Sequence, residues 1–115
     1  MTFPRDIKAE IRFLTTEEGG RSTPAFSGYR PQFFYDGTDW DAVQTYEKDG
    51  PVLPGESVIA YLGFLSPQRH IGKIKIGMDF LCREGNRTIA KGRVLEVLEL
   101  ETSAKRAIER ETKRA

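Results

Sequence analysis

The first part of the chain alternates between apolar and polar residues in the way that is typical of a half-buried β-strand. Over residues 6–14 every second side chain is apolar, from Ile7 to Phe13, and most of the positions between them are charged. Successive side chains of a strand point to opposite faces, so this spacing predicts one buried and one solvated face. A long loop rich in Gly, Ser, Thr and Pro is expected over residues 15–28.

Five further segments have the alternation or the composition of strands. The stretch 56–65 is apolar on both of its faces, which indicates that its outer surface is covered. Gly85-Asn86 is a hairpin signal between the last two strands. The five segments lie at 29–36, at 40–46, at 56–65, at a stretch with Ile74, Ile76, Met78 and Phe80 on one face, and from the Gly85-Asn86 turn through Val94, Val97 and Leu100.

Six strands with no helix between them predict an all-β fold. A small closed antiparallel β-barrel is the expected architecture, because closure removes the exposed strand edges. From Glu101 onward helix formers dominate, but only Ala104, Ala107 and Ile108 are apolar, so a short helical or disordered C-terminal tail is expected. We therefore expect one barrel domain over 1–100 and a charged tail over 101–115.

The composition, with 38% apolar and 30% charged residues among 115, is that of a globular protein rather than a disordered one. A single cysteine excludes an intrachain disulfide and favours a reducing compartment. No run of about 18 apolar residues and no apolar leader are present, so we expect a cytoplasmic protein without a membrane partner. Met1 and the charged tail ending at Ala115 favour an independent chain.

The sequence lacks the motifs of the common catalytic and metal sites. The pair Gly72-Lys73 is followed by Ile74, not by Ser or Thr, so it is not a phosphate-binding P-loop and no nucleotide is expected. Cys82 is predicted to lie in the core or at an interface and His70 in a solvated loop, and neither belongs to a nucleophile or metal-ligand pattern. We therefore expect neither an enzyme nor a cofactor or metal site.

Several separated motifs, taken together and in order, resemble one known family. Together they resemble the C-terminal β-barrel domain of elongation factor Tu over about residues 5–98, and nothing in the chain resembles the GTPase domain of that factor. The motifs are Glu18-Gly19-Gly20-Arg21, Tyr29-Arg30-Pro31-Gln32-Phe33, Pro54-Gly55, and Phe80 with Arg83-Glu84-Gly85-Asn86-Arg87-Thr88, followed by Gly92 and Val94.

The resemblance implies two kinds of contact, because in that family this domain binds the T stem of tRNA and packs against the GTPase domain. Gln32 and Gly85 match family positions near the tRNA. A partner-docking face is implied around the loop glycines and the strand residues that match the interdomain interface. Its members are Gly19, Gly20, Arg21, Gln32 and Leu81.

Two positions depart from the family in a way that weakens tRNA binding. Asp41 stands where the family usually has a Thr that contacts the T stem, and Ser66 stands where it has a basic or imidazole side chain. A carboxylate repels phosphate, and each lost cation removes one phosphate neutralisation. The loop 67–78 is longer than in the family, and its Arg69, His70, Lys73 and Lys75 offer another route to phosphate contact.

Two functions follow as hypotheses. The first, slightly favoured, is a non-enzymatic binding module related to translation elongation factors. It would contact tRNA or other structured RNA through Gln32, Gly85, Arg69, Lys73 and Lys75. The second is a protein–protein interaction module that uses the former GTPase-docking face, including Leu81, to bind a separate protein or a second copy.

Overall fold

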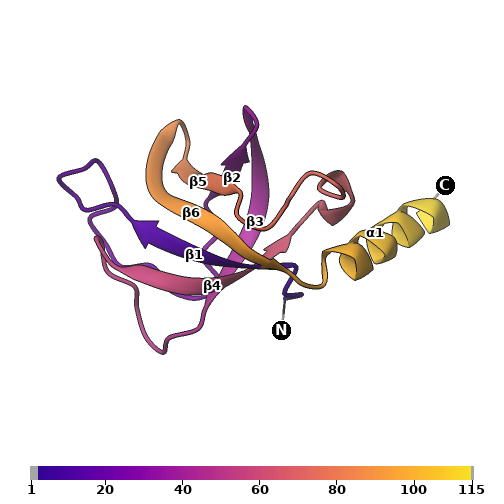
Figure 1. The fold of residues 1–115 in the computed structure, drawn as a ribbon, viewed down its shortest axis with the longest axis horizontal. Helices are drawn as coiled ribbons and strands as arrows, with labels where there is room; N and C mark the ends of the chain where they lie inside the picture. Colours follow the sequence, from indigo (N-terminus) through magenta and orange to yellow (C-terminus); the bar gives the residue numbers. More distant parts are fainter. Residues whose placement is uncertain (1–2, 115) are drawn as a thin grey trace.

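The computed structural model describes residues 3–114, in which six strands close into an antiparallel barrel and an α-helix follows (Figure 1). Around the barrel the strands neighbour one another in the order β1-β4-β3-β2-β5-β6, and β6 pairs again with β1. This confirms the predicted closed all-β barrel. Met1 and Ala115, on which the expectation of an independent chain rests, lie outside the described residues. The elements are β1 (Ile7–Phe13), β2 (Gln32–Tyr35), β3 (Thr38–Tyr46), β4 (Ser57–Phe64), the 3-10 helix η1 (Pro67–Arg69), β5 (Asp79–Glu84), β6 (Arg87–Val97) and α1 (Leu100–Arg114).

Two tight hairpins fix the register of the strands. The predicted Gly85-Asn86 turn joins β5 to β6, and Gly85 has φ 62°. A second two-residue turn, Asp36-Gly37, joins β2 to β3 with φ 49° and 76°. Two consecutive residues with positive φ are the requirement of a type I′ hairpin, for which Asp-Gly is well suited. The acidic stretch after Tyr35 therefore begins as a turn and continues into β3.

The barrel interior is packed around aromatic rings. The ring of Phe33 stacks on Phe80 with centroids 4.2 Å apart and meets Phe64 edge-on at 5.0 Å. Gly92, on the neighbouring strand, leaves the space that the Phe80 ring fills, since a Cβ there would collide with the ring atoms. Cys82 is fully buried in the same core, as the sequence predicts.

The fifth strand begins later than its alternating pattern predicts. β5 starts at Asp79, and the preceding residues form turns in which Gly72 and Gly77 have φ 76° and 85°. Ile74 is buried, but Ile76 is 70% exposed, so the two do not share a buried strand face. The prediction was wrong here because glycines in the left-handed region end an extended segment whatever the apolar spacing.

His70 lies in the core, so the prediction that it lies in a solvated loop was wrong. Its side chain is fully buried between the rings of Trp40 and Phe64, with centroids 4.8 Å and 4.3 Å away. The Nδ1 atom lies 2.7 Å from the hydroxyl of Tyr35, and Nε2 has no hydrogen-bond partner in the described part of the chain. Burial, with a smaller contribution from Lys73, lowers the pKa of His70 to about 4, so the ring is neutral at pH 7.

The C-terminal segment is an ordered helix that is anchored to one end of the barrel. Leu100, Ala104 and Ala107 are buried, and α1 packs against η1. The hydroxyl of Ser103 donates to Oδ1 of the buried Asp6, whose Oδ2 accepts from the Phe64 amide at 2.8 Å. Figure 1 shows α1 running outward from this end of the barrel. No helix in residues 3–114 is long and apolar enough to cross a membrane.

The outer face of β4 is covered in part by the chain's own N-terminal segment. A Cβ on Gly63 would lie 2.7 Å from the Pro4 carbonyl oxygen, so glycine permits the close approach of this segment. The guanidinium of Arg5 lies 4.0 Å from the centre of the Tyr61 ring. The chain's own N-terminal segment thus accounts for part of the two-sided apolar pattern of 56–65, at Tyr61 and Gly63.

Candidate functional site

The strand register brings polar residues together on the outer face of β2, β3 and β5. Gln32 pairs with Asp41 of β3 on one side and with Arg83 of β5 on the other. Its amide Nε2 donates to Oδ1 of Asp41 at 2.8 Å. Asp41 therefore holds the Gln32 side chain against the sheet surface and puts a negative charge beside it.

An apolar pair occupies the centre of this outer face. Phe34 of β2 and Leu81 of β5 are cross-strand partners, and both are half-buried. They border a shallow hollow of about 240 Å³. The Arg83 guanidinium lies 4.4 Å from the centre of the Phe34 ring and 3.7 Å from a carboxylate oxygen of Asp39. We call this surface the Phe34 face; it consists of Gln32, Phe34, Asp39, Asp41, Leu81 and Arg83.

An ion-pair cluster lies at the end of the barrel where β5 turns into β6. The carboxylate of Glu84 accepts hydrogen bonds from Arg21 and from the Tyr29 hydroxyl on one oxygen, and from Arg87 at 3.1 Å on the other. Arg21 also stacks over the Tyr29 ring at 4.5 Å. The cluster therefore ties the loop 15–28 to the Gly85 hairpin through the ion pairs of Glu84 with Arg21 and with Arg87.

The charges of this cluster are mutually stabilised. Burial works against the ionised form of Glu84, but the hydrogen bonds from Tyr29 and Arg21 outweigh it and hold the pKa of Glu84 below its usual value. Burial and the neighbouring carboxylate raise the pKa of Tyr29. Glu84 thus stays ionised and Tyr29 stays protonated at pH 7, so this arrangement is a structural clamp on the loop and has no free base.

The two loop glycines lie in different surroundings. Gly19 is exposed with φ 95°, and a Cβ there would meet nothing within 4 Å. Gly20 is buried against the backbone of Leu14, where a side chain would collide with the Leu14 carbonyl. Gly19 is therefore available at the surface, while Gly20 is required for the loop to close on itself.

The residues predicted to contact RNA are split between two ends of the barrel. Gly85 follows the last residue of β5, and Lys73 and Lys75 precede its first residue. A six-residue strand separates its ends by roughly 20 Å. Lys73 and Lys75 also share a hollow with the carboxylates of Asp36 and Asp79, whose negative charges oppose phosphate there.

The sequence did not single out Phe34 or the arginines of α1 as site residues. Phe34 is the middle residue of the run Phe33-Phe34-Tyr35. The rings on either side of it are buried, and its own ring faces outward. Strict alternation within β2 is the signal that could have found it. Ser66 lies directly before η1, and its carbonyl oxygen accepts a hydrogen bond from the Arg69 amide.

Comparison with known protein families agrees with the fold. The family described as the elongation factor Tu C-terminal domain matches residues 2–98. The match covers all six strands and the clusters described above, and it ends just before α1.

Proposed function

The chain belongs to the elongation factor Tu C-terminal domain family, and from that premise we propose that it is a non-catalytic binding module that docks a protein partner through the Phe34 face. One observation carries the proposal: an apolar pair, Phe34 and Leu81, lies at the centre of an outer sheet surface and is ringed by charged and amide groups. An apolar centre with a polar rim is the usual anatomy of a protein–protein interface.

The polar groups of the Phe34 face are already held in place, which favours docking. Gln32 is fixed by Asp41 at 2.8 Å, and Arg83 lies between the Phe34 ring and Asp39. A partner therefore meets a largely preformed surface and loses less conformational entropy on binding. The surface carries two carboxylates and one guanidinium, which suits a protein partner with complementary basic groups better than a nucleic acid.

Site-specific photo-crosslinking in cells tests this proposal. A photoreactive amino acid at Leu81 should yield a discrete crosslinked protein, and the same probe at Glu10 on the outer face of β1 should not. Phe34→Ala should abolish the Leu81 product, because it removes the centre of the face. Equal products from Leu81 and Glu10, or no product at Leu81, would contradict the assignment.

RNA binding is the second candidate, and one observation favours it. Arg69, Lys73 and Lys75 are exposed, and none has a carboxylate oxygen within 4.0 Å in residues 3–114. η1, which ends at Arg69, packs on α1 and so joins this loop to a second basic segment. Titration of labelled tRNA at two salt concentrations tests RNA binding by this loop. If the loop recognises RNA, Lys73→Glu should weaken binding more than the control Lys8→Glu on β1 does.

A further inference from the structure

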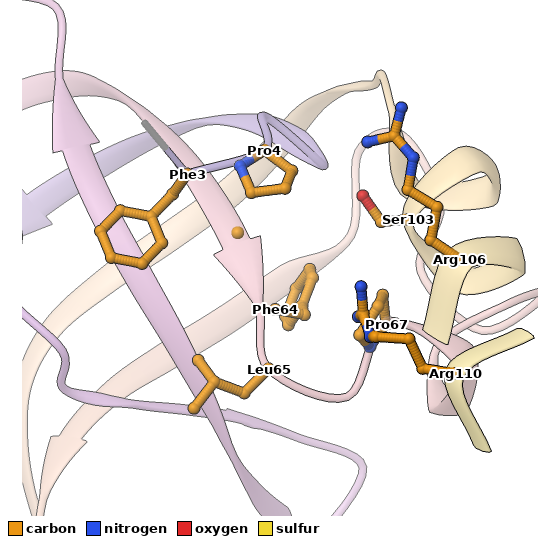
Figure 2. Close-up of a pocket in the computed structure, with 9 residues that line it drawn as sticks. Phe3, Pro4, Phe64, Leu65, Pro67, Ser103, Arg106 and Arg110 are labelled. Atoms are coloured by element: carbon orange, nitrogen blue, oxygen red, sulfur yellow. The ribbon is translucent and has the colours of Figure 1, made fainter. Parts of the chain in front are cut away.

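A pocket lies where α1 leaves the barrel, far along the chain from the Phe34 face. It has a volume of about 430 Å³ and is walled by the N-terminal segment, the end of β4, the turn before η1 and one side of α1 (Figure 2). This volume is in the range of pockets that bind small ligands or single side chains of a partner. Its lining includes Phe3, Leu65, Pro67, Arg106 and Arg110.

One wall of the pocket is apolar although it faces solvent. Phe3 and Leu65 are 42% and 48% exposed, and they lie on the side away from the helix in Figure 2. Exposed apolar side chains are ordinary when they are scattered. Here they border one hollow together with Pro4 and Pro67, so a bulky apolar group of a ligand would remove them from water.

The opposite wall is basic. Arg106 and Arg110 are one helical turn apart on α1, and Figure 2 shows both side chains extending from the helix along the pocket. Neither guanidinium has a carboxylate oxygen within 4.0 Å in the part of the chain that the structure describes. Two arginines one helical turn apart, neither with an acidic partner in the described residues, are suited to binding carboxylates, which each guanidinium can engage through paired hydrogen bonds.

The two walls are held in a fixed relation. The Asp6–Ser103 hydrogen bond joins the residue before β1 to α1, and Gln68 donates to Glu111 at 2.8 Å. The Arg5 amide donates to a Glu99 carboxylate oxygen at 2.9 Å, next to the start of α1. The pocket is therefore formed before any ligand arrives, and binding does not have to order the helix.

The charge of α1 is mixed, with a small positive excess. Beside its five basic residues the helix carries Glu101, Glu109 and Glu111, and the buried Asp6 lies next to Ser103. A long polyanion that follows the helix would bring phosphates to these glutamates as well as to the arginines, so it gains less than a ligand whose charge is confined to the pocket. A ligand with one or two carboxylates beside an apolar group meets the two arginines and the apolar wall without that repulsion.

We propose that this pocket binds a short peptide segment of a partner protein in which one or two acidic residues adjoin a bulky apolar residue. The carboxylates pair with Arg106 and Arg110, and the apolar side chain packs on Phe3, Leu65 and Pro67. Because α1 begins after the family match at 2–98, this site uses a segment that lies outside that match. It is separate from the Phe34 face, so each assignment is tested by its own variants.

The test begins with a phage-displayed library of random twelve-residue peptides, selected on the intact chain. Selection should enrich sequences that join Asp or Glu to Leu, Ile, Phe or Trp. Fluorescence anisotropy with an enriched peptide should show a loss of affinity of about tenfold or more in the double variant Arg106→Ala with Arg110→Ala. Leu65→Ser should weaken the same peptide, because it makes the apolar wall polar.

A matched double variant separates pocket binding from general attraction. Lys105→Ala with Lys113→Ala removes the same charge from the same helix, but neither lysine lines the pocket, so affinity should change by less than about twofold. All four positions are exposed, and circular dichroism will verify the helix in each variant. Equal losses in both double variants, enrichment without an acidic–apolar pattern, or tighter binding of a poly-uridine probe through the same arginines would each overturn the proposal.

Discussion

Some residues of this chain lie in surroundings that their neighbours in the sequence do not suggest. His70 is the clearest case, since a histidine in a long loop with basic neighbours is usually solvated. Its burial between Trp40 and Phe64 leaves it neutral, with a pKa near 4, and makes it part of the core. A buried neutral histidine makes stability depend on pH, because the unfolded chain binds a proton that the folded chain does not.

We predict that stability falls between pH 7 and pH 5 because of His70. The unfolded imidazole takes up a proton near pH 6.5, while the folded one does so only near pH 4, so protons favour the unfolded state in this window. The free energy of unfolding should fall by roughly 2 kcal/mol between the two pH values. Urea denaturation at each pH measures this, and His70→Gln should make the difference largely disappear.

Between pH 7 and pH 5 the other groups with shifted pKa values either change the free energy of unfolding little or act against His70. Hydrogen bonds hold the pKa of Glu18 at about 2, and the pKa values of Glu56 and Glu84 are also below normal, so the stability these carboxylates add is lost only below pH 4.5. Burial raises the pKa of Asp6, which acts in the opposite sense to His70. An unchanged pH dependence in His70→Gln would show that another group is responsible.

At the scale of elements, α1 is attached to the barrel by a small number of contacts that join distant parts of the sequence. Ser103 and Asp6 are 97 residues apart, yet their hydrogen bond lies at the centre of the attachment. Leu100, Ala104 and Ala107 supply the buried apolar stripe, which is narrow and contains small side chains. The helix therefore depends on its polar anchor more than a helix with a wide apolar face would.

We predict that Ser103→Ala destabilises the protein by about 1–3 kcal/mol, because it leaves one oxygen of the buried Asp6 without its side-chain donor. Thr102→Ala, at an exposed neighbouring position, should cost much less. Hydrogen exchange should also quicken over α1 in Ser103→Ala while the strand amides remain protected. Uniform quickening over the whole chain would show that α1 and the barrel unfold as one unit.

The sequence predicts a strand well where one face of the strand is buried and the other is solvated. The alternation from Ile7 to Phe13 gave β1 within a residue, because a strand with one buried face repeats every two residues. Similar alternation from Ile74 to Met78 failed, because two glycine turns interrupt it. The attachment of α1 could not be predicted, because its partners, Asp6 and η1, adjoin it only in the folded barrel.

The candidate site was predictable only in part for a similar reason. Family resemblance pointed to Gln32 and Leu81, and the strand register places both on the Phe34 face. Resemblance could not reveal the Phe34–Arg83 stacking or the Asp41 hydrogen bond, which depend on cross-strand neighbours. The pocket beside α1 lies outside any such inference, since it includes residues beyond 98.

At the scale of the whole molecule, closure makes each strand depend on two neighbours. Cys82 on β5 pairs with Phe33 of β2 and with Ala90 of β6, and its thiol accepts a hydrogen bond from Gln44 of β3 at 3.3 Å. Burial raises the pKa of this thiol to about 12, so the reactive thiolate is scarce as well as inaccessible. Cys82 is therefore a reporter of the opening of the whole barrel.

We predict that Cys82 does not react with a disulfide reagent on the timescale of minutes in the native protein, and that it reacts stoichiometrically in guanidinium chloride. The labelling rate at increasing denaturant should follow global unfolding measured by circular dichroism. Ser22→Cys, at an exposed loop position, provides the control and should react at once in the native state. Rapid native labelling of Cys82 would mean that β5 opens locally without the rest of the barrel.

The antiparallel pairing of β1 with β6 also determines how the molecule responds to force. Ile7, at the start of β1, pairs with Val97, at the end of β6, so a pull on the two ends of the described chain acts on the same end of this strand pair. The hydrogen bonds between the strands would then break one after another, as in a zipper, instead of sharing the load in shear. Although the barrel is closed, it is thus expected to yield to modest tension along this one seam.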